Sequence, residues 1–175
     1  RGLTPGEIVE QVQHLARDLV ADPFPQHGDR GFNVVFMGMG EPLDNFDAVR
    51  TALEIFTAPE GLGLSSRRIQ ISTSGPPHGL PRLAELGLPV GLTISLGGAD
   101  DADRRKVMPV SGKAGVAEVL DAAAEHARRH NRRVTIAWVL IRGRTDHPEQ
   151  ATTLAAVTRD RPFKGGTTMS AAPAN

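Results

Sequence analysis

Glycines and hydroxyl side chains follow three short apolar segments of this sequence, and one carboxylate stands among them. Glycine lets a ligand approach the backbone, hydroxyls can hold a carboxylate or a ribose, and Glu41 can accept a charge-assisted hydrogen bond from an ammonium or hydroxyl group. No lysine joins the glycines, so the set suits a small zwitterionic or nucleoside ligand better than a phosphate. The three runs are Gly38-Met39-Gly40-Glu41-Pro42, Ser72-Thr73-Ser74-Gly75 and Ser95-Leu96-Gly97-Gly98.

Each run taken alone also fits an ordinary turn, because glycine is common in turns and Ser or Thr often caps the following helix. The dinucleotide-binding fingerprint is not met, since Pro42 and Leu43 occupy the stretch where its third glycine would fall, and a phosphate-binding P-loop is absent. The recurrence of such runs after three successive segments is what favours a ligand site.

The elements that must position these residues alternate between helix and strand. A capping box of Thr4 and Glu7 predicts a first helix with a periodic apolar face (Ile8, Val12, Leu15 and Leu19). Asp44 and Asp146 are expected to cap two later helices, the first of which buries Val49, Leu53 and Ile55. Apolar runs predict strands at 32–37, 68–72, 90–96 and 133–141, and further helices are expected at 80–86, 115–130 and 146–157.

This order is one helix followed by about four strand–helix units, which predicts a parallel α/β sheet with right-handed crossovers. A complete eight-fold barrel takes about 250 residues, so the chain fits a partial (βα) barrel or half of a doubly wound sheet. Ligand chemistry collects at the carboxyl ends of the strands in both architectures, which is where the three runs fall.

Composition narrows the function classes. The 175 residues carry 20 basic and 20 acidic side chains, 39 % apolar residues and no cysteine. Zero net charge argues against a strongly basic nucleic-acid surface, and no apolar run approaches the length of a membrane span. Without cysteine, disulfides, thiolate zinc sites, a cysteine nucleophile and a thiolate-held iron–sulfur cluster are excluded within these residues.

Other constellations favour structural roles. His126 and His130 have metal-ligand spacing, but no third ligand is obvious, and cationic side chains at a helix C-terminus are the preferred interpretation. Asp100, Asp101 and Asp103 are expected to begin a short helix rather than bind a metal, and Trp138 is expected in the core. The basic clusters suggest solvated faces, with contact to RNA phosphates as the alternative: Arg67-Arg68, Arg104-Arg105-Lys106 and residues 128–133.

Several stretches together resemble one family, the radical S-adenosylmethionine (SAM) methyltransferases of the RlmN type, which modify C2 of adenine in 23S rRNA and tRNA. The resemblance covers roughly residues 1–160 in order and spacing. Its most specific part is the Met-Gly-Met-Gly-Glu-Pro run after the first strand. The matching stretches are 3–12, 33–43, 72–75, 94–96, 105–110 and 132–135.

The resemblance implies a partial, six-stranded radical SAM barrel with SAM and a 4Fe–4S cluster at the strand ends. Matched by motif, Gly40 and Glu41 correspond to positions that bind the SAM amino group, and Ser72 and Ser95 to further SAM contacts. It implies rRNA and tRNA as partners, an electron donor for the cluster and a cytoplasmic location. It places no catalytic residue and no metal ligand within this chain.

The family chemistry depends on cysteines: a Cys-x3-Cys-x2-Cys cluster motif and a methyl-carrying cysteine near the C-terminus. The resemblance therefore implies that this chain begins just after the cluster motif and ends before the methyl carrier, as a central fragment covering 1–164 with a divergent or disordered tail at 165–175. We expect the full-length parent to be the enzyme and this chain alone to be inactive.

Three internal departures from the family pattern support a rival interpretation. Gly97 replaces a histidine, Ala137 lies where a carboxylate is usual, and Thr145 replaces an asparagine. A degenerate homologue that binds SAM or RNA without catalysis would tolerate these losses. A cofactor-free βα-barrel metabolic enzyme is a third reading, although Glu41 stands nearly alone as an acid–base group at the strand ends.

Overall fold

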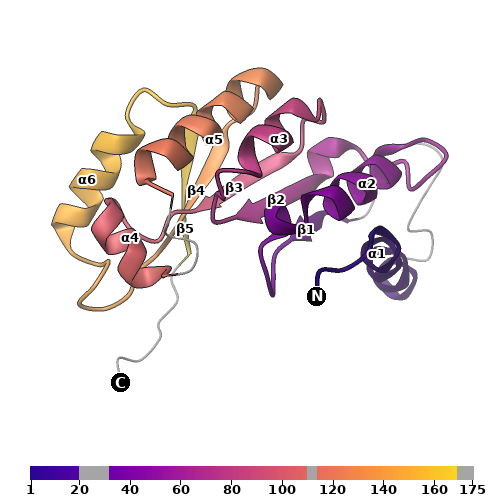
Figure 1. The fold of residues 1–175 in the computed structure, drawn as a ribbon, viewed down its shortest axis with the longest axis horizontal. Coiled ribbons are helices and arrows are strands. Elements are labelled where there is room, and N and C mark those ends of the chain that lie inside the picture. Colours follow the sequence, from indigo (N-terminus) through magenta and orange to yellow (C-terminus); the bar gives the residue numbers. More distant parts are fainter. Residues whose placement is uncertain (20–31, 110–113, 169–175) are drawn as a thin grey trace.

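The computed structural model describes residues 1–19, 32–109 and 114–168, and within them five parallel strands alternate with helices (Figure 1). The strands are β1 (Val34–Phe36), β2 (Ile69–Thr73), β3 (Gly91–Ser95), β4 (Val134–Val139) and β5 (Phe163–Thr168). The α-helices are α1 (Pro5–Leu19), α2 (Phe46–Thr57), α3 (Leu80–Glu85), α4 (Asp101–Val107), α5 (Val116–His130) and α6 (Pro148–Thr158), with 3-10 turns η1 (Pro42–Asn45) and η2 (Ser66–Arg68).

The strand order settles which parallel architecture the chain adopts. The strands lie side by side in the order in which they occur along the chain, β1-β2-β3-β4-β5. Each half of a doubly wound sheet supplies three strands in chain order and the order reverses between the halves, whereas five successive strands without a reversal form a barrel wall. Figure 1 shows α2, α3 and α5 together on one side of the strands. The partial (βα) barrel is therefore confirmed, and the doubly wound alternative is wrong.

The core lies between the sheet and these helices. Alternate strand residues such as Ile69, Ile71 and Ile94 are buried and join a cluster with Leu53 and Phe56 of α2. The intervening residues of β2 and β3 are half-buried, because neighbouring side chains of a strand point to opposite faces. The helix face of the sheet is thus apolar, and its other face carries polar side chains in β2 and β3 and the exposed Val35 and Val139 in β1 and β4.

The first helix forms as its capping box predicts. The Thr4 backbone N–H donates to Glu7 Oε2 at 2.7 Å, and the Glu7 N–H donates to Thr4 Oγ1 at 3.3 Å. Arg1 also binds Glu7, and these contacts lower the pKa of the Glu7 carboxyl to about 2. Leu15 is exposed, contrary to expectation, because α1 packs through Ile8, Val12 and the buried Ala16.

Two predicted helix caps are wrong. Asp44 lies inside η1, and the Glu41 side chain caps that turn instead, so α2 begins at Phe46. Asp146 accepts the Gly143 N–H at 2.8 Å and so stabilises the turn before α6, whose N-cap is His147. In both cases the acidic side chain lies beside a turn that precedes the helix, and sequence spacing does not separate such turns from helix starts.

A fifth strand departs from the sequence prediction. From residue 165 the sequence predicts a divergent tail, but β5 continues to Thr168 and pairs in parallel with β4, from Val134↔Phe163 to Val139↔Thr168. Gly165 and Gly166 carry no strand signal, so β5 depends on the backbone ladder that β4 provides. Residues 169–175 of the expected tail lie outside the described residues.

Candidate functional site

The three glycine and hydroxyl runs meet at one edge of the sheet. Gly40 and Glu41 follow β1, Ser72 is near the end of β2, and Ser95 ends β3. Parallel pairing of β1 with β2 and of β2 with β3 brings these carboxyl ends side by side. The edge formed by these four residues is called here the strand-end site.

The Glu41 carboxylate is held by the neighbouring strand. Its Oε1 accepts hydrogen bonds from the Leu43 N–H at 3.0 Å and from Thr73 Oγ1 at 2.6 Å. Its Oε2 accepts from both the N–H and the hydroxyl of Ser74, each at 2.8 Å. A carboxylate offers about four acceptor positions, so these four donors occupy the set. The hydroxyls at the end of β2 thus bind a carboxylate, as their types suggest, but this carboxylate is the protein's own Glu41.

Ser72 and Ser95 lie on the sheet face that carries polar side chains. Their neighbours Ile71, Thr73 and Ile94 are buried on the helix side, whereas both serines are half-buried. In the ladder, Ser72 pairs with Thr93 and Ser95 with Ala137. On the same face, Gln70 donates to Thr93 Oγ1 at 2.7 Å. The face therefore offers hydroxyl and amide groups to a ligand.

The turn after β1 is open on the side of Gly40. Gly40 has φ +99°, in the region that L side chains rarely adopt, and no atom lies within 4 Å of where its Cβ would be. Met39 beside it is fully exposed, and Met37 is largely so. A backbone free of side-chain cover is what a ligand needs to approach a main-chain carbonyl or amide.

Arg104 is a residue of this region that sequence reasoning missed. The sequence pattern places it with Arg105 and Lys106 on a basic face, yet its side chain is 0 % exposed while both neighbours are exposed. Its guanidinium donates to the backbone carbonyls of Ser74 at 2.6 Å and Leu96 at 2.5 Å. The glycine pair before α4 was the available signal, because it permits a helix to approach a strand end closely.

The surroundings of the histidine pair disfavour the charged form of both rings. The His126 ring is buried with Nε2 3.2 Å from the Val90 carbonyl, and the ring centroids of His126 and His130 are 4.5 Å apart. Burial lowers the pKa of His126 to about 4 and also lowers the pKa of His130. Burial thus disfavours the expected interaction of these two histidines, as cations, with the helix C-terminus, whereas Arg128 and Arg129 do lie in the last turn of α5.

The acidic run before α4 acts in helix capping, as predicted. Asp100 accepts the Asp103 N–H at 2.8 Å, and Asp101 accepts the Val116 N–H at the start of α5 at 2.7 Å. Asp103 binds Lys106 at 3.1 Å, and this contact lowers the pKa of the Asp103 carboxyl. Among the described residues, no group of three or more His, Cys, Asp or Glu side chains is arranged to hold a metal ion.

The internal departures from the family pattern are accommodated locally. Gly97 has φ +75°, and a Cβ there would lie 2.5 Å from Met108 Sδ. The buried Thr145 hydroxyl accepts the Ile141 N–H at 2.8 Å and donates to the Val139 carbonyl at 2.5 Å. Trp138, in the core as predicted, donates its Nε1–H to the Thr145 carbonyl at 3.2 Å.

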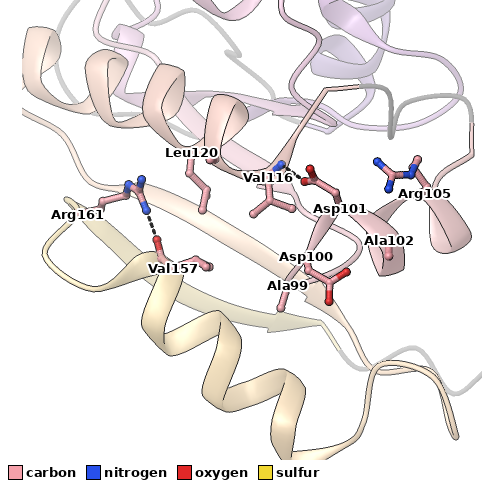
Figure 2. A pocket seen from close by; sticks show the side chains of 10 residues that line it. Ala99, Asp100, Asp101, Ala102, Arg105, Val116, Leu120, Val157 and Arg161 are labelled. Atoms are coloured by element: carbon pink, nitrogen blue, oxygen red, sulfur yellow. Dashed lines mark hydrogen bonds between the residues drawn. The ribbon is translucent and has the colours of Figure 1, made fainter.

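A cavity of about 590 Å³ lies away from the strand-end site, between α4, α5 and the α6–β5 connection (Figure 2). Figure 2 shows Asp101 turned toward the N-terminus of α5 and Arg161 toward the Val157 carbonyl, so both polar groups are engaged by the protein. None of the four predicted site residues lines this cavity. None of the described helices is both long and apolar enough to cross a membrane.

Comparisons with known proteins agree with this fold. The model of the radical SAM superfamily matches residues 1–155. Probable dual-specificity RNA methyltransferases RlmN from Symbiobacterium thermophilum and Parafrankia sp. are each 48 % identical, over 89 % and 90 % of this chain and 40 % and 43 % of their own lengths. The crystal structure of a radical SAM methyltransferase from Sphaerobacter thermophilus superposes with TM-score 0.86 at 34 % identity, covering 95 % of this chain and 48 % of that one. The chain thus spans less than half the length of these relatives.

Proposed function

The chain belongs to the radical SAM superfamily, and from this premise we propose that it supplies the SAM-binding wall of an RNA methyltransferase that acts on C2 of adenine in 23S rRNA and tRNA. The observation that carries the proposal is the strand-end site: Gly40, Ser72 and Ser95 lie at the carboxyl ends of consecutive parallel strands, at one edge of the sheet. The names of the relatives, RNA methyltransferases of the RlmN type, support RNA as the substrate.

SAM fits the donors and acceptors of this edge. The hydroxyls of Ser72 and Ser95 can bind its carboxylate or ribose, and the open backbone at Gly40 can accept a hydrogen bond from its ammonium group. Because four donors already occupy the Glu41 carboxylate, we assign the contact at Glu41 to its backbone and give its side chain the task of fixing the turn. SAM, when bound, supplies the methyl group and the precursor of the radical.

The 4Fe–4S cluster that the family implies does not fit this chain. Cluster irons are held by cysteine thiolates, and the sequence contains no cysteine. We therefore derive no step through the cluster and assign to the described residues only the binding and orientation of SAM. The cluster, the methyl-carrying cysteine and the reductant belong, on this proposal, to the parent protein, which acts in the cytoplasm, and this chain alone is inactive.

A degenerate homologue that binds SAM or RNA without catalysis is the second candidate. The departures at Gly97, Ala137 and Thr145 favour it, since each removes a polar group of the family pattern. Membership of the radical SAM superfamily argues against the cofactor-free metabolic barrel. A Cys-x3-Cys-x2-Cys motif encoded immediately before Arg1 would favour the enzyme over the degenerate homologue.

Isothermal titration of this chain with SAM tests the proposal. We expect one SAM per chain, and binding about two- to tenfold weaker in Ser72→Ala and in Ser95→Ala, since each loses one hydrogen bond. Ser66→Ala is the matched control, because Ser66 is also half-buried but lies at the amino end of β2. Absence of binding to the unmodified chain, or equal weakening by Ser66→Ala, would contradict the proposal.

A further inference from the structure

The Arg104 side chain makes an unusual set of contacts for a residue in a short surface helix. It is 0 % exposed, and its donors point to main-chain carbonyls. Nη2 donates to the Ser74 carbonyl at 2.6 Å, and Nη1 donates to those of Leu96 at 2.5 Å and Ser95 at 3.3 Å. Nε donates to the Ala114 carbonyl at 3.3 Å. One side chain thus contacts the ends of two strands and the segment that enters α5.

These contacts begin where the ladder between β2 and β3 stops. The last residues that these two strands pair are Thr73 and Ile94, so Ser74 and Ser95 lie just beyond the β2–β3 pairing, while Ser95 still pairs with Ala137 of β4. A buried carbonyl without a partner costs free energy, and strands that lose their ladder can separate. The planar guanidinium, with five N–H donors, replaces the ladder at this point.

The backbone around Arg104 is shaped to bring it close. A Cβ on Gly98 would lie 2.3 Å from the Arg104 backbone nitrogen, so only glycine permits α4 to approach the end of β3. Ser74 joins this arrangement to β1, because its N–H and hydroxyl bind Glu41 while its carbonyl binds Arg104. The contacts Glu41–Ser74–Arg104–Leu96 therefore cross the ends of β1, β2 and β3.

Burial of a guanidinium is costly, and it lowers the pKa of Arg104. An apolar side chain would fill the same space at a lower desolvation cost. An arginine is used here because its N–H donors bind the carbonyls at the ends of β2 and β3 and so fix the geometry of these strand ends.

We propose that Arg104 is a positioning residue of the strand-end site: by binding the carbonyls of Ser74, Ser95 and Leu96, it fixes the separation of the β2 and β3 ends and so pre-arranges Ser72 and Ser95 for SAM. This inference rests on the proposed function for the identity of the ligand. The relation of Arg104 to the two strand ends rests on the contacts alone.

Hydrogen exchange and SAM titration of Arg104→Lys test the proposal, with Arg105→Lys as the matched control on the same helix. Lysine keeps the charge but cannot reach carbonyls on both strands at once. We expect at least tenfold faster amide exchange in residues 72–75 and 95–98, unchanged exchange in β4 and α5, and SAM binding weakened at least fivefold. Arg105→Lys should change neither, because Arg105 is exposed.

Gly98→Ala provides a second approach, since its added Cβ must displace α4 from the strand end, and it should give the same local pattern. Exchange that rises uniformly over all strands, or strand ends and SAM affinity that stay as in the unmodified chain, would overturn the proposal. If the unmodified chain binds no SAM while the local exchange still rises in Arg104→Lys, the proposed function fails and the role of Arg104 at the strand ends stands.

Discussion

Glu41 Oε2 accepts two hydrogen bonds from Ser74, one from its N–H and one from its hydroxyl, each at 2.8 Å. Through this pair the turn after β1 is fixed to the end of β2. A family motif that suggests a ligand-binding acid therefore also contains a structural connection between two strands.

Replacing Glu41 by glutamine should destabilise the chain. Either orientation of the amide turns its NH2 group toward a backbone N–H, that of Leu43 or that of Ser74, in a region where Thr73 and Ser74 are buried. We expect a loss of about 1–3 kcal/mol in the free energy of unfolding, measured in urea. Glu60→Gln, at an exposed position, is the control, and equal stability of the two variants would contradict the assignment.

Gly97 and Met108 should be energetically coupled. Gly97→Ala adds a Cβ 2.5 Å from Met108 Sδ and strains a φ of +75°, so a loss of about 1–3 kcal/mol is expected. In a double-mutant cycle with Met108→Ala, measured by thermal unfolding, the second change should remove the part of the loss that comes from the steric clash. The part that comes from the strained φ should remain. Strict additivity of the two changes would count against the contact.

The Thr145 hydroxyl should contribute to stability through two backbone contacts. Thr145→Val leaves the Ile141 N–H and the Val139 carbonyl without this partner, which we expect to cost about 1–3 kcal/mol in urea unfolding. Thr153→Val on the exposed side of α6 serves as control. A Thr145→Val chain as stable as the control would show that water replaces the hydroxyl.

The buried His126 should make the chain less stable in mild acid. Its pKa is about 4 in the folded chain and near 6.5 when unfolded, so the unfolded state binds more protons between these values. The free energy of unfolding is therefore unaffected by the protonation of His126 above about pH 6.5. It decreases as the pH falls toward 4, by up to about 1.4 kcal/mol per pH unit.

Unfolding between pH 7 and 5 isolates this effect, because ordinary carboxyl groups titrate mainly below that range. His126→Gln should reduce the change of unfolding free energy with pH. A smaller pH dependence should remain, because the pKa of His130 is lowered in the same direction. A slope that His126→Gln leaves unchanged would assign the effect elsewhere.

Anaerobic reconstitution with iron and sulfide should leave this chain without a cluster. The sequence has no cysteine, and the described residues hold no three-ligand group. Iron and sulfide analysis after desalting, with the visible spectrum, checks the result. A stable stoichiometric cluster would contradict both the lack of thiolate ligands in this chain and the proposal that the cluster belongs to the rest of the parent protein.

Much of the fold could be predicted because strand and helix periodicities are local. The alternation that places Ile69 and Ile71 on one face of β2 is visible in the sequence, as are the capping box at Thr4 and the start of α5 after Gly115. The positions of Gly40, Ser72 and Ser95 at strand ends follow from the same patterns. Caps such as those expected at Asp44 and Asp146 were less predictable, since one acidic residue suits either a turn or a helix start.

Sequence alone thus determined the parallel strand–helix alternation, the edge at which polar residues gather, and the absence of thiolate chemistry, because these depend on residue type and short spacing. Only the tertiary structure decided the order of the strands in the sheet and the presence of β5. It alone also decided that Thr73 and Ser74 occupy the acceptors of Glu41 and that Arg104 is buried. Each of these depends on hydrogen bonds between residues far apart in the chain, which residue type permits but does not specify.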